Sequence, residues 1–242
     1  MKPIYIPKGK ALEYADYSLN IYTGCNHGCT YCYASDMHRR FHPEQPFEDV
    51  QPREGLLEAL DRQLYYGMAG VPFRGKTVHL CFTCDPYPAP PVDTTITRAV
   101  IGRLKAAGCY VQILTKGGCR AMRDFDLLGP GDWFGATLTG FSAAQDEPNA
   151  APGHERIEAL YRAHEKGINT WASLEPVLHE EEAFWTIRYV DFVDQFRIGK
   201  LNYRPSTINW GAFGRECERL AKELGRNIVI KDDLRAEMER QP

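Results

Sequence analysis

Three closely spaced cysteines constrain this chain more than any other feature. They lie in Gly24-Cys25-Asn26-His27-Gly28-Cys29-Thr30-Tyr31-Cys32, with three residues between the first two cysteines and two between the second pair. A cubane iron–sulfur cluster takes thiolate ligands, usually four. A short loop that offers three thiolates can hold three irons and leave the fourth iron open to a small chelating ligand. The spacing therefore predicts a cubane cluster on Cys25, Cys29 and Cys32, with chemistry starting at the open iron.

Two other uses of three cysteines must be weighed. A structural zinc site commonly takes two Cys or Cys/His pairs, so His27 would have to complete the tetrahedron from inside the same loop. A disulfide would leave one cysteine over, and the first residues lack the long apolar core of a signal peptide. Inert buried cysteines are usually scattered on apolar faces, as we expect for Cys109, Cys119 and Cys217. We favour the cluster over both alternatives.

Short β-type runs alternate with helical runs along the chain. Six strands are expected at 19–22, 77–82, 110–114, 133–138, 170–174 and 195–199, and a seventh at 227–230. Apolar residues at helical spacing, such as Leu56, Leu60 and Leu64, predict the intervening helices. This rhythm favours a parallel sheet or barrel. The sequence thus predicts an α/β fold, a partial (β/α)6 TIM-type barrel of parallel strands with a short C-terminal βα extension.

The length of 242 residues with 43% hydrophobic content suits one domain. We find no internal repeat, low-complexity tract or long linker, so we expect a single domain over 1–242, with its barrel core at about 17–205 and the extension at about 206–242. No apolar run approaches the roughly 20 residues of a membrane span. We therefore expect a cytoplasmic protein with no membrane partner.

The net charge of −3 gives no overall electrostatic signature of a nucleic-acid binder. One local run, His38-Arg39-Arg40-Phe41-His42, mixes cations with an aromatic ring, as a groove for phosphates and bases does. A solvated basic surface explains so short a run equally well. A local contact with nucleic acid therefore stays open at this point.

Polar residues follow every one of the six expected barrel strands. In α/β barrels the active site is built at the carboxyl ends of the strands. Loops are polar in general, so some of this pattern arises by chance. Lys116 and Glu175 stand out because each is a charged residue directly after an apolar strand. We expect both at the catalytic edge of the sheet.

The pattern Cys-x-x-x-Cys-x-aromatic-Cys, with Tyr31 as the aromatic residue, resembles the signature of the radical S-adenosylmethionine enzymes. In that family the amino and carboxylate groups of S-adenosylmethionine chelate the open iron, and an electron from the cluster cleaves the sulfonium to a 5′-deoxyadenosyl radical. Further segments, over about residues 15 to 205, are similar to the spore photoproduct lyase-like branch. These segments are Thr83-x-Asp85-Pro86-Tyr87, Thr115-Lys116, Arg123-Asp124, Asp126-Leu127-Leu128, Glu147-Pro148 and Arg156-Ile157.

The resemblance implies a role for each matching position. Cys25, Cys29 and Cys32 would ligate a [4Fe–4S] cluster, and Tyr31 would pack beside the adenine. Lys116 would neutralise the cofactor carboxylate, a task suited to a point charge. The remaining cofactor contacts would be Thr83, Cys84 and Asp85 for the amino group, Thr137 and Thr139 for the ribose, and Glu175 near the adenosyl or substrate end. Strand propensity alone also explains the two threonines.

One position departs from the branch. Spore photoproduct lyases resemble one another in placing a hydrogen-donating cysteine three residues before the aspartate of the Asp85 turn, where this chain has Phe82. Cys84 is the candidate substitute, either as hydrogen donor or only as pocket wall. Regular strand alternation would put Cys81 and Thr83 on one face and Phe82 and Cys84 on the other.

The sequence therefore favours a radical S-adenosylmethionine enzyme, with Cys84 and Glu175 as candidate catalytic residues, acting on a nucleic-acid base or nucleotide. Modification of a peptide or small metabolite is the alternative reaction. A non-catalytic iron–sulfur protein for electron transfer, or a structural metal protein, is the alternative of another class. The resemblance implies a flavodoxin or ferredoxin as electron donor.

Overall fold

The parallel strands line up in one open sheet in the computed structural model, which describes residues 2–140 and 145–240. The sheet order is β1-β2-β5-β6-β7-β8-β9-β10, and only the β1–β2 pair is antiparallel. The strands are β1 (Ile4–Tyr5), β2 (Tyr17–Leu19), β5 (Thr77–Leu80), β6 (Tyr110–Thr115), β7 (Trp133–Thr137), β8 (Asn169–Leu174), β9 (Gln195–Ile198) and β10 (Ile228–Ile230). The predicted α/β fold with a partial barrel is confirmed.

Two strands differ from the expected ranges by two residues or more, and the others agree to within one residue at each end. The first barrel strand ends at Leu19, and the chain then forms β3 (Tyr22–Thr23), which pairs antiparallel with β4 (Gln51–Pro52). The second strand ends at Leu80 and not at Phe82. Strand β1 was not predicted, because a two-residue strand is too short to show a period of two.

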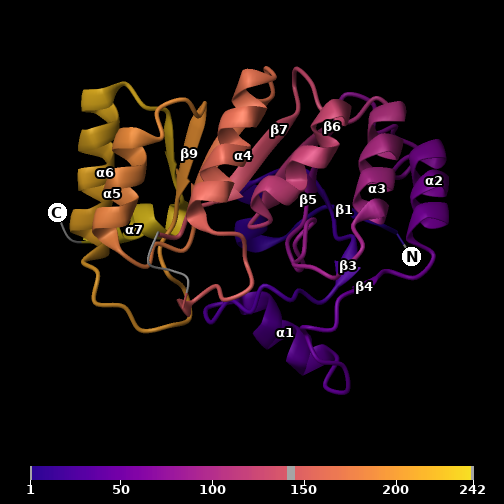
Figure 1. The fold of residues 1–242 in the computed structure, drawn as a ribbon, viewed down its shortest axis with the longest axis horizontal. Coiled ribbons are helices and arrows are strands. Elements are labelled where there is room, and N and C mark those ends of the chain that lie inside the picture. The colour runs from indigo at the N-terminus through magenta and orange to yellow at the C-terminus, as the bar shows by residue number, and fades with distance from the viewer. Residues whose placement is uncertain (1, 141–144, 241–242) are drawn as a thin grey trace.

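Helices connect the parallel strands and pack side by side across one face of the sheet (Figure 1). They are α2 (Leu56–Tyr66), α3 (Thr95–Ala106), the 3-10 helix η2 (Gly118–Leu127), α4 (Gly153–Glu165), α5 (Glu180–Tyr189) and α6 (Trp210–Leu224). Helix α7 (Asp232–Arg240) follows the last strand and packs against α6. Helix α1 (Tyr33–Phe41) follows the cysteine loop and lies apart from this layer, at the bottom of Figure 1. None of the described helices is both long enough and apolar enough to cross a membrane.

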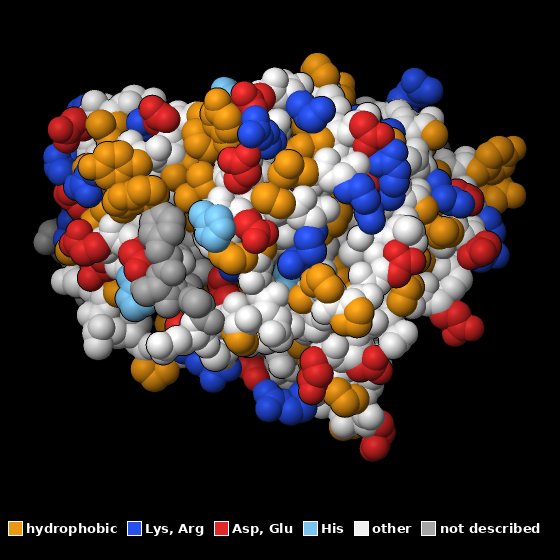
Figure 2. Space-filling view, in the orientation of Figure 1, with side chains coloured by type: hydrophobic (Ala, Val, Ile, Leu, Met, Phe, Trp, Pro, Cys, Tyr) orange, Lys and Arg blue, Asp and Glu red, His pale blue; other side chains and the backbone are white. Residues whose placement is uncertain are grey.

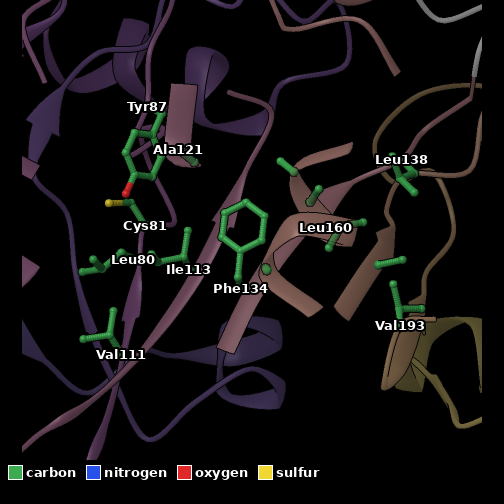
Figure 3. Packing of buried hydrophobic residues seen from close by; sticks show 14 of the residues in the cluster. Leu80, Cys81, Tyr87, Val111, Ile113, Ala121, Phe134, Leu138, Leu160 and Val193 are labelled. Carbon is green, nitrogen blue, oxygen red and sulfur yellow. The ribbon is translucent and has the colours of Figure 1, made fainter. Parts of the chain in front are cut away.

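The hydrophobic core lies between the sheet and its helices. Val111 and Ile113 of β6 and Phe134 of β7 are fully buried, as is Leu160 of α4 (Figure 3). Each such side chain contributes about 1.5–3 kcal/mol by leaving water. These strands read as nearly continuous apolar runs because both faces of a parallel sheet are covered.

An aromatic cluster fills the inside of the barrel. The ring of His79 stacks on Phe82 with centroids 4.4 Å apart, and Tyr14 packs edge-on against Trp171. Gly135 is needed here, because a Cβ would lie 2.2 Å from the Trp171 ring. Burial lowers the pKa of His79 to about 3, so this imidazole is neutral. Side chains therefore fill the barrel interior below the carboxyl ends of the strands.

The open side of the sheet is crossed by the 3-10 helix η1 (Gly9–Glu13), which precedes β2. Lys10 Nζ lies 2.6 Å from Asp233 Oδ2 on α7, and the Glu13 carbonyl accepts a hydrogen bond from Arg197 of β9. Lys231, directly after β10, donates to the Lys10 carbonyl. The η1 segment thus links the β2 edge of the sheet to the β9–β10 edge.

Candidate functional site

A cavity of about 560 Å³ opens at the carboxyl ends of the parallel strands. Its wall runs from the three cysteines of the loop, past the ends of β5, β6 and β8, to Lys231 after β10. Cys25, Cys29 and Cys32 are free thiols, and each is partly exposed to this cavity. The polar strand ends that the sequence singles out thus lie around a single space.

The cysteine loop is fixed by backbone contacts with two distant segments. Gly24 has a φ of +82°, and a Cβ there would lie 2.4 Å from the Phe47 carbonyl oxygen. That same oxygen accepts a hydrogen bond of 2.7 Å from Cys25 N. On the other side, Thr30 N donates to the Asp146 carbonyl at 2.9 Å. The loop is therefore held in one conformation before any ligand binds.

The donor set fits an iron–sulfur cluster better than a single metal ion. Among the described residues, no group of three or more His, Cys, Asp or Glu side chains is placed to hold one ion. A cubane cluster does not need three side chains that converge on one ion, because each thiolate binds a different iron. His27 does not complete a zinc site: it is buried, with Nδ1 3.5 Å from Asp85 Oδ2 and Nε2 3.3 Å from Arg120. Burial raises the pKa of the Cys25 and Cys29 thiols.

Glu147 organises the side of the cavity next to Cys29. Its carboxylate pairs with Arg156 at 2.5 Å, lies 4.0 Å from Lys116 Nζ and accepts hydrogen bonds from the hydroxyls of Tyr31 and Thr139. Burial opposes ionisation, but the charges of Lys116 and Arg156 hold the pKa of Glu147 below its ordinary value. The carboxylate is therefore charged and joins two predicted cofactor residues, Tyr31 and Thr139, to a third, Lys116.

Lys116 is a cation beside Tyr31 of the cysteine loop. It follows β6, and its ammonium group lies 5.6 Å from the centre of the Tyr31 ring. Burial alone would lower its pKa, but the Cys29 and Glu147 charges outweigh burial and raise it. Lys116 therefore remains protonated while lining the cavity, which suits an anionic ligand group.

Asp85 stabilises the turn after β5 through its hydrogen bonds. One oxygen accepts from the Thr115 hydroxyl at 2.5 Å and from Tyr87 N at 2.7 Å; the other accepts from Lys116 N at 2.8 Å. The neighbouring Thr83 N donates to Asn20 Oδ1 at 3.1 Å. Thr83, Cys84 and Asp85 all line the cavity.

The two predicted ribose residues are placed differently. Thr137, at the end of β7, lines the cavity. Thr139 is buried behind the cavity wall, where its hydroxyl donates to Glu147 at 2.9 Å. Only Thr137 reaches the surface of the cavity.

The expected alternation after β5 is wrong. Because the strand stops at Leu80, Cys81 and Cys84 do not point to opposite faces: both line the cavity, and each thiol influences the pKa of the other. Phe82 also lines it and stacks on His79. The sulfur of Cys84 accepts a hydrogen bond of 3.5 Å from Tyr22 N.

The far end of the cavity carries Glu175. It follows β8, its Oε1 has no hydrogen-bond partner, and that atom lies 4.0 Å from Lys231 Nζ. Burial raises the pKa of Glu175 to about 7, although Lys231 and Arg197 oppose the rise. Ser173, whose buried Oγ is also unpartnered, lies on the same wall. Near neutral pH, Glu175 is therefore populated in both its protonated and its ionised form.

Sequence reasoning missed Glu147 and Lys231 as site residues. Lys231 directly follows the expected strand at 227–230, so the rule of polar strand ends could have found it. Glu147 lies in a loop with no strand before it, and only its contacts with Tyr31, Lys116 and Arg156 reveal it.

The basic run around α1 is less cationic than its sequence suggests. His38 is buried, and its Nε2 lies 3.0 Å from the Gln45 carbonyl oxygen. Arg39 pairs with Asp36. Figure 2 shows acidic, basic and apolar side chains intermixed on the part of the surface that α1 forms. Aromatic rings are nevertheless exposed there and at the rim, including Tyr33, Phe41 and Tyr203.

Comparison with known proteins gives one family match and several relatives. A family model described as the Radical SAM superfamily matches residues 19–191. An uncharacterized protein of Acidianus two-tailed virus is 29% identical over 179 residues, which cover 70% of this chain and 58% of that protein. An uncharacterized protein of Mycobacterium tuberculosis (strain ATCC 25618 / H37Rv) is 32% identical over 115 residues, covering 46% of this chain and 32% of that protein. The matched part is less than two thirds of either relative's length.

Solved structures share the fold at low sequence identity. Spore photoproduct lyase complexed with dinucleoside spore photoproduct has a TM-score of 0.70 and 13% identity, covering 93% of this chain and 79% of that chain. Streptococcus suis SuiB bound to S-adenosylmethionine has a TM-score of 0.60 and 11% identity, covering 88% of this chain and 46% of that chain. At these identities the likeness concerns the fold.

Proposed function

Because this chain belongs to the radical S-adenosylmethionine superfamily, we propose that it binds a [4Fe–4S] cluster and S-adenosylmethionine to act on a nucleic-acid base or nucleotide. Family membership implies S-adenosylmethionine, an iron–sulfur cluster, an electron donor and a substrate. One observation carries the proposal: the three-cysteine loop opens onto a 560 Å³ cavity that Lys116 and the unpartnered polar side chains of Ser173 and Glu175 also line.

We assign the residues of the cavity as follows. Cys25, Cys29 and Cys32 hold the cluster, and when bound, the cluster and S-adenosylmethionine supply reductive sulfonium cleavage and a hydrogen-abstracting 5′-deoxyadenosyl radical. Lys116 binds the cofactor carboxylate, since it stays cationic beside Cys29. The Thr83, Cys84 and Asp85 turn receives the amino group, Tyr31 packs near the adenine, and Thr137 reaches the ribose with Thr139 behind it.

The nucleic-acid assignment rests on the rim of the cavity. Lys8 and Lys10 line the cavity together with Tyr203, a residue that is 84% exposed. Lys10 Nζ lies 5.9 Å from the centre of that ring. Cations for phosphate beside an exposed ring for stacking are the elements of a single-strand site. Spore photoproduct lyase, which shares the fold, is complexed with a dinucleoside in its structure.

Two residues at the substrate end have proposed catalytic roles. Cys84 would return a hydrogen atom to the substrate radical, in place of the donor that Phe82 replaces. Glu175 would contact substrate from the end of β8, where it lines the cavity. The reducing cytoplasm is the compartment we propose, because all eight cysteines are free thiols, and a flavodoxin or ferredoxin is the electron donor we propose.

The test is formation of 5′-deoxyadenosine. The chain is reconstituted anaerobically with iron and sulfide, reduced with dithionite and incubated with S-adenosylmethionine, and the products are separated by chromatography. We expect 5′-deoxyadenosine from the wild type and only background from Cys25→Ala, Cys29→Ala or Cys32→Ala. Cys119→Ala, which removes a thiol outside the cavity, is the matched control and should stay at wild-type yield.

The same assay tests the substrate class. Dinucleoside spore photoproduct and thymine-containing oligonucleotides are added, and we expect one of them to accelerate cofactor cleavage. Acceleration by peptides alone would reject the nucleic-acid assignment and favour the peptide alternative. A loaded cluster that neither binds nor cleaves S-adenosylmethionine would reject the enzyme itself.

A further inference from the structure

A Cys-x-x-Cys motif forms part of the cavity wall. Its members, Cys81 and Cys84, flank Phe82 and Thr83 directly after β5, where the chain has left the regular strand. Figure 3 shows Cys81 among the side chains of the hydrophobic core. Both cysteines line the cavity, and Cys81 is 7% exposed. The pair therefore faces the space where substrate would bind.

The two thiols lie close enough to influence each other. The Cys84 sulfur accepts a hydrogen bond of 3.5 Å from Tyr22 N. Burial raises the pKa of Cys81, whereas the hydrogen bonds of the Cys84 sulfur lower the pKa of Cys84 against the effect of burial. The backbone N–H of Tyr22 thus favours negative charge on the Cys84 sulfur, and two adjacent thiols in a Cys-x-x-Cys motif are typical of redox-active pairs.

Outside the cysteine loop, the other three cysteines lack this arrangement. Cys109 and Cys217 are buried, and neither lines the cavity. Cys119 Sγ is occupied by the Glu155 carbonyl oxygen at 3.5 Å. Residues that only form the wall of a pocket need apolar side chains, and they do not need two adjacent thiols.

We propose that Cys81 and Cys84 form a dithiol–disulfide couple that acts on the substrate in this cavity. In the reaction, which rests on the proposed function, one S–H bond breaks and gives its hydrogen atom to a carbon-centred substrate radical, forming a C–H bond. The second thiol loses its proton, and the two sulfurs join. The remaining odd electron passes to a one-electron acceptor of the iron–sulfur class. The dithiol is oxidised by two electrons; the substrate radical and the acceptor are each reduced by one.

The couple can be tested without turnover. The cluster-loaded full chain is equilibrated anaerobically in glutathione buffers of graded redox ratio, quenched in acid, alkylated with N-ethylmaleimide and digested with trypsin. Cleavage after Lys76 and Arg98 releases peptide 77–98, whose only cysteines are Cys81 and Cys84. Peptides 106–116 and 117–120, which carry Cys109 and Cys119, are internal controls.

We expect peptide 77–98 to change in one two-electron transition from the doubly alkylated form to an unalkylated form two hydrogens lighter. The control peptides should stay singly alkylated. Cys81→Ser should abolish the internal link and leave Cys84 alkylated or glutathionylated. A wild-type peptide that stays doubly alkylated throughout, or that takes up glutathione on one sulfur, would overturn the couple.

A second measurement tests its part in the reaction. The cluster is reduced with one equivalent of dithionite, the excess reductant is removed, and S-adenosylmethionine is added with dinucleoside spore photoproduct as the probe. We expect disulfide in peptide 77–98 to increase in step with product, and product without disulfide would reject the catalytic role. A chain that forms the disulfide in glutathione but makes no 5′-deoxyadenosine would instead refute the proposed function alone.

Discussion

At the scale of single residues, Glu175 shows how position changes the chemistry of an ordinary side chain. Partly buried at the end of β8, it has no hydrogen-bond partner at Oε1, and its closest cation, Lys231, lies 4.0 Å away. Gly199 permits this placement, because a Cβ there would approach Glu175 to 3.0 Å. Lys231 is shared, since its Nζ also lies 3.7 Å from Glu13. Lys231 therefore compensates the negative charge of the Glu175 carboxylate only in part.

This residue predicts a pH dependence of stability. Burial raises the pKa of Glu175 from 4.5 to about 7, so between those values the native state binds more protons than the unfolded state. The free energy of unfolding should therefore fall as the pH rises through this window, by about 3 kcal/mol in total. In Glu175→Gln this contribution should vanish. Urea unfolding at pH 5, 6, 7 and 8 measures it; Glu165→Gln, at an exposed position, is the control, and equal slopes in both variants would contradict the assignment.

At the scale of elements, the cysteine loop depends on the segment that precedes α4. Glu147 binds the Tyr31 hydroxyl, and the adjacent Asp146 accepts from Thr30 through both its carbonyl and its side chain. Arg156 of α4 holds Glu147 in place. The loop itself has no regular structure to fix it, so these contacts preorganise the three thiols.

Glu147→Gln should weaken the contacts that hold the cysteine loop in place. The amide leaves the buried charges of Arg156 and Lys116 without their counter-charge, which costs about 3 kcal/mol of stability. We expect a lower urea midpoint and fewer irons retained per chain after desalting of the reconstituted protein. Glu165→Gln, on an exposed turn of the same helix α4, should change neither. Full iron retention in Glu147→Gln would show that the loop is held without the carboxylate.

At the scale of the whole molecule, the η1 segment ties the first part of the chain to the last. Asp233 binds Lys10 at 2.6 Å and Asn202 at 2.8 Å, and Lys231 donates to the Lys10 carbonyl. The two contacts of Lys10 join residues more than 190 positions apart in sequence, whereas Asn202 and Asp233 both belong to the C-terminal part. They bound the cavity where the sheet itself is open.

Asp233→Asn should weaken this link. Loss of the charge-assisted hydrogen bond to Lys10 removes about 1 kcal/mol, which corresponds to a roughly five-fold increase in local opening. Hydrogen–deuterium exchange should therefore be faster in residues 9–13 and unchanged in β6. Asp126→Asn, a change at an exposed carboxylate that pairs with Arg98 far from η1, is the control. Unchanged exchange in residues 9–13 would mean that packing alone holds η1.

Much of the site could be predicted because its signals are local in sequence. The cysteine spacing, the turn at Asp85 and the position of Lys116 are each readable within a few residues, and all three line the cavity. The paired placement of Cys81 and Cys84 could not be predicted, since it follows from where β5 stops. Nor could the role of Glu147, which depends on contacts with Tyr31 and Arg156 across the chain.

The sequence by itself determined the βα order, the parallel sheet and the three-cysteine loop, because periodicity and ligand spacing are properties of neighbouring residues. Only the tertiary structure decided which charged groups meet. Glu147 with Lys116, Glu175 with Lys231, and Lys10 with Asp233 are separated by 31, 56 and 223 positions, respectively. Their pairing is set by how strands and connecting loops converge at one edge of the sheet, and no local pattern encodes that convergence.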